Sequence, residues 1–464
     1  MRIDPFRPTG LHVSALALAA LLPFPLACTA LPSAPPAPRA VVMLIGDGFG
    51  FSQLTLARLA LAGKGGRMAM EAMPATGFVS TWSASNAVTD SGAGATAFGS
   101  GVKTDNRYIG LDPERRPTRS LGEIAKAAGW RVGYVTTTRI THATPACFYA
   151  HHDDRYDEEA IAAQLIAADV DLALGGGKAN FLPAAESGAR RDGRNLLDEA
   201  EQSGWRLLER GSPLAWDGTG KLLGLFANGH LAYALDDRNY PAERRDPPLA
   251  ELTRLALDGL ARGDKPFFLM VEGGRIDHAG HEFDAAGVVA ESKGFDETVA
   301  TTLAWAKEHP GTLVVLTADH ATGGLAVNDF ARIDELARQR ASVAWMANQI
   351  RNAGAGVEML SARTGYGDWS AEDVEAIRVA PDSYEACRRL GTKLAVRNGL
   401  TWVPRVNDDD THGHTGEDVP IFAFGPGAER FAGVLDNTEI PQRIAALAGL
   451  PFPDTTAGRG PSPP

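Results

Sequence analysis

Three stretches of the chain are continuously apolar, and an acidic residue follows each of them within three positions. The stretches are Ala40–Ile45, Pro266–Val271 and Thr312–Leu316. Runs of this kind are typical of strands that are buried on both faces, as in parallel sheets covered by helices. The sequence therefore predicts an α/β protein, a three-layer αβα sandwich with a large mostly parallel central sheet and a helical insertion.

Weaker patterns complete the expected sheet and its covering helices. Further strands are expected at residues 77–82, 131–137, 170–174 and 419–424, and helices at 52–62, 121–128, 249–260 and 288–306. Residues 186–245 are polar and rich in Gly and Arg, which predicts peripheral loops and short elements. Residues 331–400 have helical patterns, with one helix expected over 334–350, and this change of character indicates an insertion.

The N-terminus has the features of a targeting segment. Arg2 and Arg7 precede an apolar run from Val13 to Leu26 that is short and interrupted by proline, which predicts a secretory signal peptide over residues 1–30. The alternative is a lipoprotein signal that ends at Cys28 and leaves a membrane-anchored product. Either way, the sequence predicts a secreted or periplasmic protein.

The expected organisation has a core interrupted by one insertion. After the signal peptide, the units are a Pro-rich linker at 31–39, a core made of 40–330 with 411–450, the helical insertion at 331–410 and a disordered tail at 451–464.

The charge balance argues against polyanionic partners. The chain has 57 acidic and 45 basic residues, a net charge of −12, and no long basic run, so specificity for nucleic acid is not expected. After signal cleavage only Cys147 and Cys387 are certain to remain, and a disulfide between them is an open alternative.

The run from Val88 to Ala97 places one serine among very small side chains. Its alanines favour a helix, for which Asp90 or Ser91 is the expected N-cap. A serine at that position lies among free N–H groups and the positive end of the helix dipole, where phosphate binds well. An ordinary helix cap is the alternative, since the spacing lacks the Gly-x-Ser-x-Gly pattern of α/β hydrolases.

Acidic and histidine side chains recur after most of the predicted buried strands, and His414 lies in a turn before the strand at 419–424. The residues are Asp47, Glu272, Asp277, His281, Asp319, His320 and His414. Each has an ordinary structural interpretation, but in a parallel sheet these strand ends converge on one crevice. Several carboxylates crowded there repel one another unless cations neutralise them. His with Asp suits Zn²⁺ and oxygen ligands suit Mg²⁺, so the sequence predicts a multi-metal site for phosphoryl transfer.

Six short motifs carry a resemblance to a known family. They are Ile-Gly-Asp-Gly at 45–48, Thr-Asp-Ser at 89–91, Ala-Thr-Pro at 143–145, Val-Glu-Gly-Gly-Arg-Ile-Asp-His at 271–278, Thr-Ala-Asp-His at 317–320 and His-Thr-Gly-Glu-Asp-Val at 414–419. In this order, from about residue 40 to 445, the chain resembles the alkaline phosphatases. The resemblance implies hydrolysis of small-molecule phosphate monoesters.

The resemblance also implies a role for each matched residue. Ser91 would be the phosphorylated nucleophile, and Arg155 would hold two phosphate oxygens; a solvated surface Arg155 is the alternative. The implied cofactors are two Zn²⁺ and one Mg²⁺. One zinc would bind Asp277, His281 and His414, the other Asp47, Asp319 and His320, and the magnesium Asp47, Thr144 and Glu272. Positions 142 and 278 are His142 and His278 here, where other members carry Asp and Lys.

Other activities remain open at this point. A phosphodiesterase of the same superfamily and a non-catalytic metal- or phosphate-binding homologue are the alternatives. A sulfatase is disfavoured because no Cys/Ser-x-Pro-x-Arg motif lies near Ser91. The sequence also leaves open a homodimer contact through the insertion and a lipid anchor at Cys28.

Overall fold

The computed structural model describes residues 37–403, 411 and 413–453. The predicted signal peptide, the lipid anchor predicted at Cys28 and most of the predicted linker and tail lie outside the described residues. Among the described helices, none is both long and apolar enough to span a membrane.

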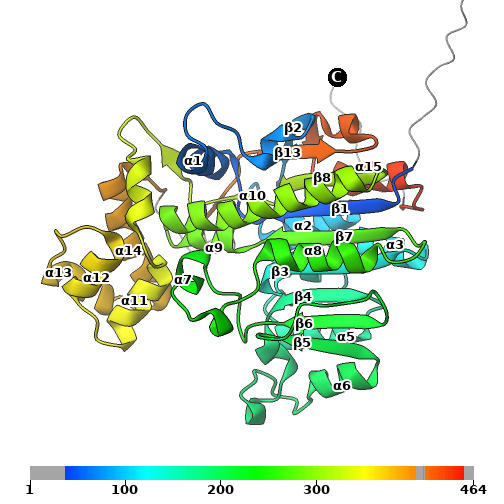
Figure 1. The fold of residues 1–464 in the computed structure, drawn as a ribbon, viewed down its shortest axis with the longest axis horizontal. Helices are drawn as coiled ribbons and strands as arrows, with labels where there is room; N and C mark the ends of the chain where they lie inside the picture. The colour runs from blue at the N-terminus through cyan, green and yellow to red at the C-terminus, as the bar shows by residue number, and fades with distance from the viewer. Residues whose placement is uncertain (1–36, 404–410, 412, 454–464) are drawn as a thin grey trace, which may run out of the picture. The chain divides into compact units, whose positions relative to one another are not determined.

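A ten-stranded, mostly parallel sheet forms the centre of the described chain (Figure 1). Its strands, in spatial order, are β14 (Gly433–Asp436), β2 (Ala75–Ser80), β13 (Val419–Phe424), β8 (Thr312–Ala318), β1 (Ala40–Gly46), β7 (Phe267–Gly273), β3 (Arg131–Arg139), β4 (Leu172–Gly176), β6 (Lys221–Leu225) and β5 (Trp205–Glu209). Only β13 runs antiparallel to its neighbours. The three continuous apolar runs form β1, β7 and β8 at the middle of the sheet, and every residue of these strands is buried.

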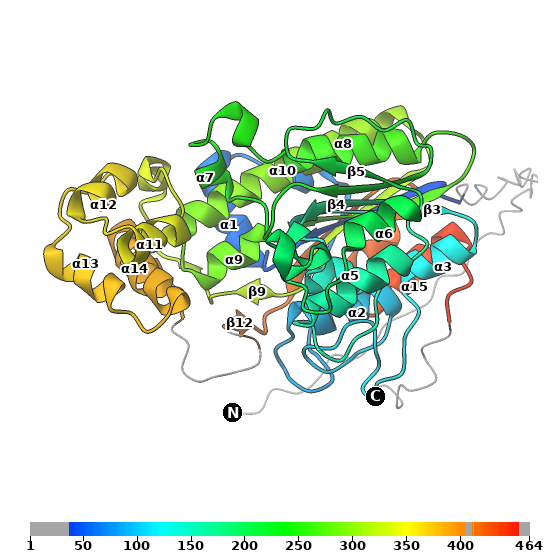
Figure 2. The same ribbon diagram turned by 90° about the horizontal axis from the view of Figure 1, so that it is seen from below.

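Helices cover both faces of the sheet, as the predicted three-layer sandwich requires. Figure 2 shows α8 (Leu249–Leu260) and α10 (Ala285–Glu308) on one face. The opposite face carries α2 (Ser91–Ser100), α3 (Leu121–Ala127), α5 (Glu158–Ala167), α6 (Leu196–Gln202) and α15 (Glu439–Ala448). The remaining short helices of the core are α1 (Phe51–Leu61), α4 (Ala143–Ala146), α7 (Ala234–Asp237) and α9 (Arg275–His281).

The insertion is helical but does not begin with the single helix expected over 334–350. A 3₁₀ helix, η5 (Ile333–Arg338), is followed by α11 (Val343–Asn352), and Ser342 caps α11 by accepting a hydrogen bond from the Trp345 N–H. Then follow α12 (Val357–Thr364), α13 (Ala371–Arg378) and α14 (Ser383–Asn398). These helices enclose a small hydrophobic core of their own, around Val343, Leu360 and Leu390.

One further expectation is wrong, and one open alternative is excluded. Residues 186–245 are not only peripheral, because β5 and β6 lie within them and extend the central sheet. β5 is the edge strand, where only Trp205 and Leu208 are buried, and β6 has only five residues, so neither has a long apolar run. Cys147 and Cys387 are both buried free thiols and form no disulfide.

Candidate active site

Three neighbouring strands deliver carboxylates to one edge of the sheet. β1 pairs with β7 on one side and β8 on the other, and the registers place Gly46 level with Gly273 and Ala318. Asp47 and Asp319 directly follow this level, and Glu272 directly precedes it. All three side chains are fully buried. The predicted convergence of acidic residues at the carboxyl ends of the strands is therefore present.

The turn after β1 packs directly against α9. Gly48 has a φ of +67°, and a Cβ atom there would lie 2.8 Å from the Cα of Asp277. Only glycine combines this backbone conformation with so close an approach. The contact brings Asp47, at the end of β1, next to Asp277 on α9.

Asp277, His281 and His414 form the first group of potential metal ligands, with their ligand atoms within 4.8 Å of one another. His281 Nε2 lies 3.1 Å from Asp277 Oδ2 and 3.1 Å from His414 Nε2. His414 Nδ1 donates to the carbonyl oxygen of Thr89 at 2.9 Å, because that oxygen can only accept. In the neutral ring, Nε2 of His414 therefore directs its lone pair toward His281, an arrangement suited to a shared cation.

The second group surrounds His320, which follows β8. Its Nε2 lies 3.5 Å from Asp47 Oδ1, 3.3 Å from Asp319 Oδ2 and 3.2 Å from Ser91 Oγ. The backbone N–H groups of Gly48 and His320 both donate to Asp319 Oδ1. Asp319 Oδ2 is left buried without a hydrogen-bond partner.

The third group forms around Glu272. Ligand atoms of Asp47, His142 and Glu272 lie within 4.8 Å of one another. Thr138 Oγ1 donates to Glu272 Oε2 at 3.1 Å, and Thr136 bonds the same oxygen. Glu272 Oε1 and the hydroxyl of the nearby Thr144 are buried without hydrogen-bond partners. The structure thus places His142, as well as Thr144, beside the two carboxylates.

Ser91 is the first residue of α2, and Asp90 is the N-cap. Asp90 Oδ1 accepts a hydrogen bond from the Ala93 N–H at 2.9 Å, which settles which of the two caps the helix. Ser91 is 2% exposed, and its hydroxyl faces His320. Small side chains let α2 approach the strand edge, since a Cβ atom on Gly94 would lie only 3.2 Å from Asp319 Cβ.

Arg155 reaches this site and is not a solvated surface residue. Its Nη1 donates to Asp90 Oδ2 at 2.8 Å, and its Nη2 lies 3.2 Å from His142 Nε2. Asp90 therefore joins the start of α2 to Arg155. Sequence reasoning recognised Asp90 only as a cap, because the partner of its second oxygen lies 65 positions away.

The sequence analysis also missed His230. Its ring centroid lies 4.3 Å from that of His278 and 5.5 Å from that of His142. Burial lowers the pKa of all three histidines well below its usual value, so their rings are neutral. Arg275 Nη1 lies 2.6 Å from His278 Nδ1. His230 lies in the stretch expected to be peripheral, and no nearby acid or buried run marked it.

The electrostatics of the site leave negative charge poorly compensated. Burial, and then the neighbouring carboxylates, raise the pKa of Asp47 well above its usual range. Burial raises the pKa of Glu272 to about 7 and also raises that of Asp319. Burial opposes ionisation of Asp277 too, but His281 and His414 outweigh it and lower the pKa of Asp277 well below its usual range.

The donor set fits bound cations. Both carboxylate oxygens of Asp47, one each of Asp319 and Glu272, and the Thr144 hydroxyl are buried without hydrogen-bond partners. Buried polar groups are normally paired, so unpaired ones that point to a common space indicate an ion. The first two groups combine imidazole with carboxylate, as zinc prefers. In the third group the carboxylates and the Thr144 hydroxyl are oxygen donors that suit magnesium, while the His142 imidazole also suits zinc.

Comparison with known proteins places the chain in a family. A model of the alkaline phosphatase family matches residues 38–450. Alkaline phosphatase 4 of Bacillus subtilis is 33% identical over 368 residues, which cover 76% of this chain and 75% of that protein. Streptomycin-6-phosphate phosphatase of Streptomyces griseus is 33% identical over 482 residues, covering 94% and 96%. The crystal structure of Thermus thermophilus alkaline phosphatase matches with a TM-score of 0.79 at 29% identity, covering 93% of this chain and 96% of that one. This chain belongs to the alkaline phosphatase family.

Proposed function

We propose that the enzyme hydrolyses small-molecule phosphate monoesters through a phosphoserine at Ser91, with two zinc ions and one magnesium ion. The observation that carries the proposal is the position of the Ser91 hydroxyl. It lies 3.2 Å from His320 Nε2, at the N-terminus of α2, and the adjacent Asp90 binds Arg155.

The proposed ligands follow the three groups of side chains. Asp277, His281 and His414 hold one zinc, and Asp47, Asp319 and His320 hold the other; Asp47, Glu272 and Thr144 hold magnesium, with His142 beside them. When bound, the cations supply the positive charge that activates the serine hydroxyl and stabilises the leaving oxygen.

The protein's own groups divide the remaining work. N–H groups of the Arg155 guanidinium bind two phosphate oxygens in a bidentate manner. The free N–H groups at the start of α2 add a positive potential for the phosphate. Ser91 Oγ forms a bond to phosphorus while the ester P–O bond breaks and the alcohol leaves. A water molecule then attacks the phosphoserine, which restores Ser91 and releases inorganic phosphate.

Substitution of Ser91 by alanine tests the proposal. Ser91→Ala should lower kcat for p-nitrophenyl phosphate by a factor of about 10³ or more while the zinc content is unchanged. Ser100→Ala is the matched control, since Ser100 lies buried at the other end of the same helix and donates to the Thr96 carbonyl. Activity of Ser91→Ala equal to that of Ser100→Ala would exclude Ser91 as the nucleophile.

We further propose that residues 1–30 direct export, so that the enzyme acts as a secreted or periplasmic protein. The charged start, the short apolar run and the small residues around Cys28 support this. The proposed unit organisation is a phosphatase core of residues 40–330 with 411–450, interrupted by the insertion at 331–410.

A further inference from the structure

A cavity opens beside the first ligand group, which consists of Asp277, His281 and His414. Its volume is about 580 Å³, within the range of small-molecule sites. The core contributes His281, His278, Arg275 and Glu282 to its wall, and the insertion contributes Asp382 and Tyr384. Because His281 also belongs to the first ligand group, the cavity adjoins the proposed reaction centre.

The geometry of the proposed reaction places this cavity on the side from which the alcohol leaves. In an in-line displacement the leaving oxygen departs opposite the attacking one. The attacking Ser91 hydroxyl lies against His320, in the second group. The alcohol must therefore leave on the side of the first group, where His281 forms part of the cavity wall.

The cavity wall carries polar side chains of both hydrogen-bonding kinds, the guanidinium of Arg275 and the carboxyl groups of Glu282 and Asp382. Arg275 Nε and Glu282 Oε2 are buried and have no hydrogen-bond partner. A guanidinium can only donate, whereas a carboxyl group offers oxygen atoms that accept. A hydroxyl group can both donate and accept, so a ligand with several hydroxyls matches both.

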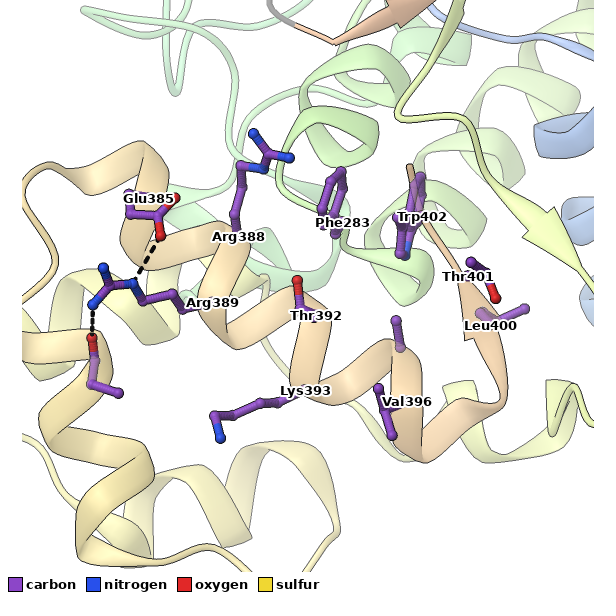
Figure 3. Close-up of a pocket in the computed structure, with 12 residues that line it drawn as sticks. Phe283, Glu385, Arg388, Arg389, Thr392, Lys393, Val396, Leu400, Thr401 and Trp402 are labelled. Atoms are coloured by element: carbon purple, nitrogen blue, oxygen red, sulfur yellow. Dashed lines mark hydrogen bonds and ion pairs between the residues drawn. The ribbon is translucent and has the colours of Figure 1, made fainter. Parts of the chain in front are cut away.

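The insertion is held firmly against this wall. A Cβ atom on Gly391 of α14 would lie 2.2 Å from the backbone oxygen of Glu282, so α14 packs directly on the turn that follows α9. Phe283, in that turn, has a φ of +57° and stacks on Trp402 with ring centroids 5.3 Å apart. Figure 3 shows Arg388 of α14 extending beside Phe283, with its guanidinium 4.6 Å from the ring.

The same packing sets the position of Tyr384. The Arg388 guanidinium lies 5.6 Å from the Tyr384 ring, and that ring lies 6.3 Å from the ring of His281. An aromatic face at the edge of a polar cavity offers a surface for the C–H face of a sugar or polyol.

We propose that this cavity is the subsite for the leaving group and that it selects hydroxyl-rich alcohols, such as those of sugar and polyol phosphates. The inference rests on the proposed phosphomonoesterase activity and extends it to substrate class. Glu282 and Arg275 pair with hydroxyls of the leaving group, and Tyr384, supplied by the insertion, packs against its carbon skeleton.

A matched pair of substrates tests the selection. Sorbitol 6-phosphate and hexyl phosphate are both six-carbon esters of a primary alcohol, and they differ in the hydroxyls. The wild-type enzyme should show a kcat/KM about tenfold or more higher for sorbitol 6-phosphate, the size of effect expected for one or two hydrogen bonds.

Variants assign the preference to the cavity. Glu282→Gln and Tyr384→Ala should each lower the ratio of the two kcat/KM values by about threefold or more. Thr392→Ala is the control: it lies on the same helix but lines the separate groove shown in Figure 3, and it should leave the ratio unchanged.

The outcomes separate this inference from the proposed function. A wild-type ratio near one, a preference for hexyl phosphate, or variants with an unaltered ratio would overturn the subsite while p-nitrophenyl phosphate is still hydrolysed. A wild-type enzyme that hydrolyses none of the three esters would overturn the phosphomonoesterase itself.

Discussion

Asp90 has two roles that can be separated. One oxygen caps α2 through the Ala93 N–H, and the other accepts hydrogen bonds from the Arg107 N–H and from Arg155 Nη1. Asparagine is as good an N-cap as aspartate, but it cannot form the ion pair with Arg155. The substitution Asp90→Asn therefore isolates the role of the carboxylate in positioning Arg155.

Asp90→Asn should weaken phosphate binding by about tenfold, the loss expected for a charge-assisted hydrogen bond. The inhibition constant of inorganic phosphate measures this, together with zinc content, which should not change. Asp157→Asn is the control, because Asp157 caps α5 through the Ala160 N–H. Equal phosphate inhibition of the two variants would show that Asp90 is only a cap.

Asp284, which belongs to none of the three ligand groups, makes the free energy of unfolding depend on pH. Its carboxylate accepts hydrogen bonds from the N–H groups of Gly287 and Val343 and from the Gln339 side chain, so it joins α10 to the insertion. Burial nevertheless raises the pKa of Asp284 to about 6. Because the folded-state pKa exceeds that of the unfolded chain, the contribution of Asp284 is full below pH ~4 and is lost as the pH rises through about 6.

The free energy of unfolding of the wild type, relative to that of Asp284→Asn, should therefore fall as the pH rises. Wild type should lose about 1–3 kcal/mol relative to the variant between pH 4.5 and 7.5. Urea unfolding of both proteins at the two pH values, in the same chelator, measures this. A difference that is constant or grows with pH would contradict the raised pKa.

Single residues were predictable from sequence where the backbone fixes their neighbours. Asp47 and Asp319 were expected to meet because they end adjacent parallel strands. Asp90 as a partner of Arg155, and His230 beside His278, depend on loops whose course has no periodic signal. Sequence alone gave no reason to bring those pairs together.

At the scale of elements, α2 shows how packing controls the site. A Cβ atom added to Gly94 would lie 3.2 Å from the Cβ of Asp319. A Cβ atom added to Gly99 would lie 3.6 Å from its nearest neighbour. The first distance is tighter than an ordinary contact, and the second is normal.

Alanine substitutions of these two glycines should thus act differently. Gly99→Ala should preserve activity and stabilise the protein by up to about 1 kcal/mol, the usual gain of Ala over Gly in a helix. Gly94→Ala should displace Asp319 and lower kcat/KM by about tenfold. Kinetics and thermal unfolding of both variants measure the contrast, and equal activities would show that α2 does not constrain Asp319.

The elements were predicted best where the apolar pattern was strong. The helix at 249–260 and the strand at 419–424 have the expected bounds. The helix expected over 334–350 fails because Asp236 accepts hydrogen bonds from both the N–H and the hydroxyl of Ser342, which starts a new helix there. Such a tertiary contact leaves no trace in local periodicity.

At the scale of the whole molecule, the fold class was predictable because strands of a covered parallel sheet have continuous apolar runs, and the family was predictable because six short motifs occur in that family's order. The contact between the insertion and the turn after α9 was not, since it depends on a close approach at Gly391 and on the left-handed conformation of Phe283. Neither feature belongs to the motifs that identify the family.

Removal of metal should destabilise the entire enzyme. The unpaired buried oxygens of Asp47, Asp319 and Glu272 lose their proposed partners on chelation. A fall in melting temperature of about 10 °C, reversed by zinc and magnesium, is expected from the loss of tightly bound ligands. A chelated protein that is inactive at an unchanged melting temperature, or still active with no zinc or magnesium detected, would contradict a metal centre in these groups.

The most direct test of the central claim is to map the covalent intermediate. The enzyme is incubated with ³²P-labelled phosphate, quenched in acid and digested, and the labelled peptide is sequenced. The account predicts label on Ser91 alone, absent from Ser91→Ala and present in Ser100→Ala. Label on any other residue, or label retained by Ser91→Ala, would contradict it.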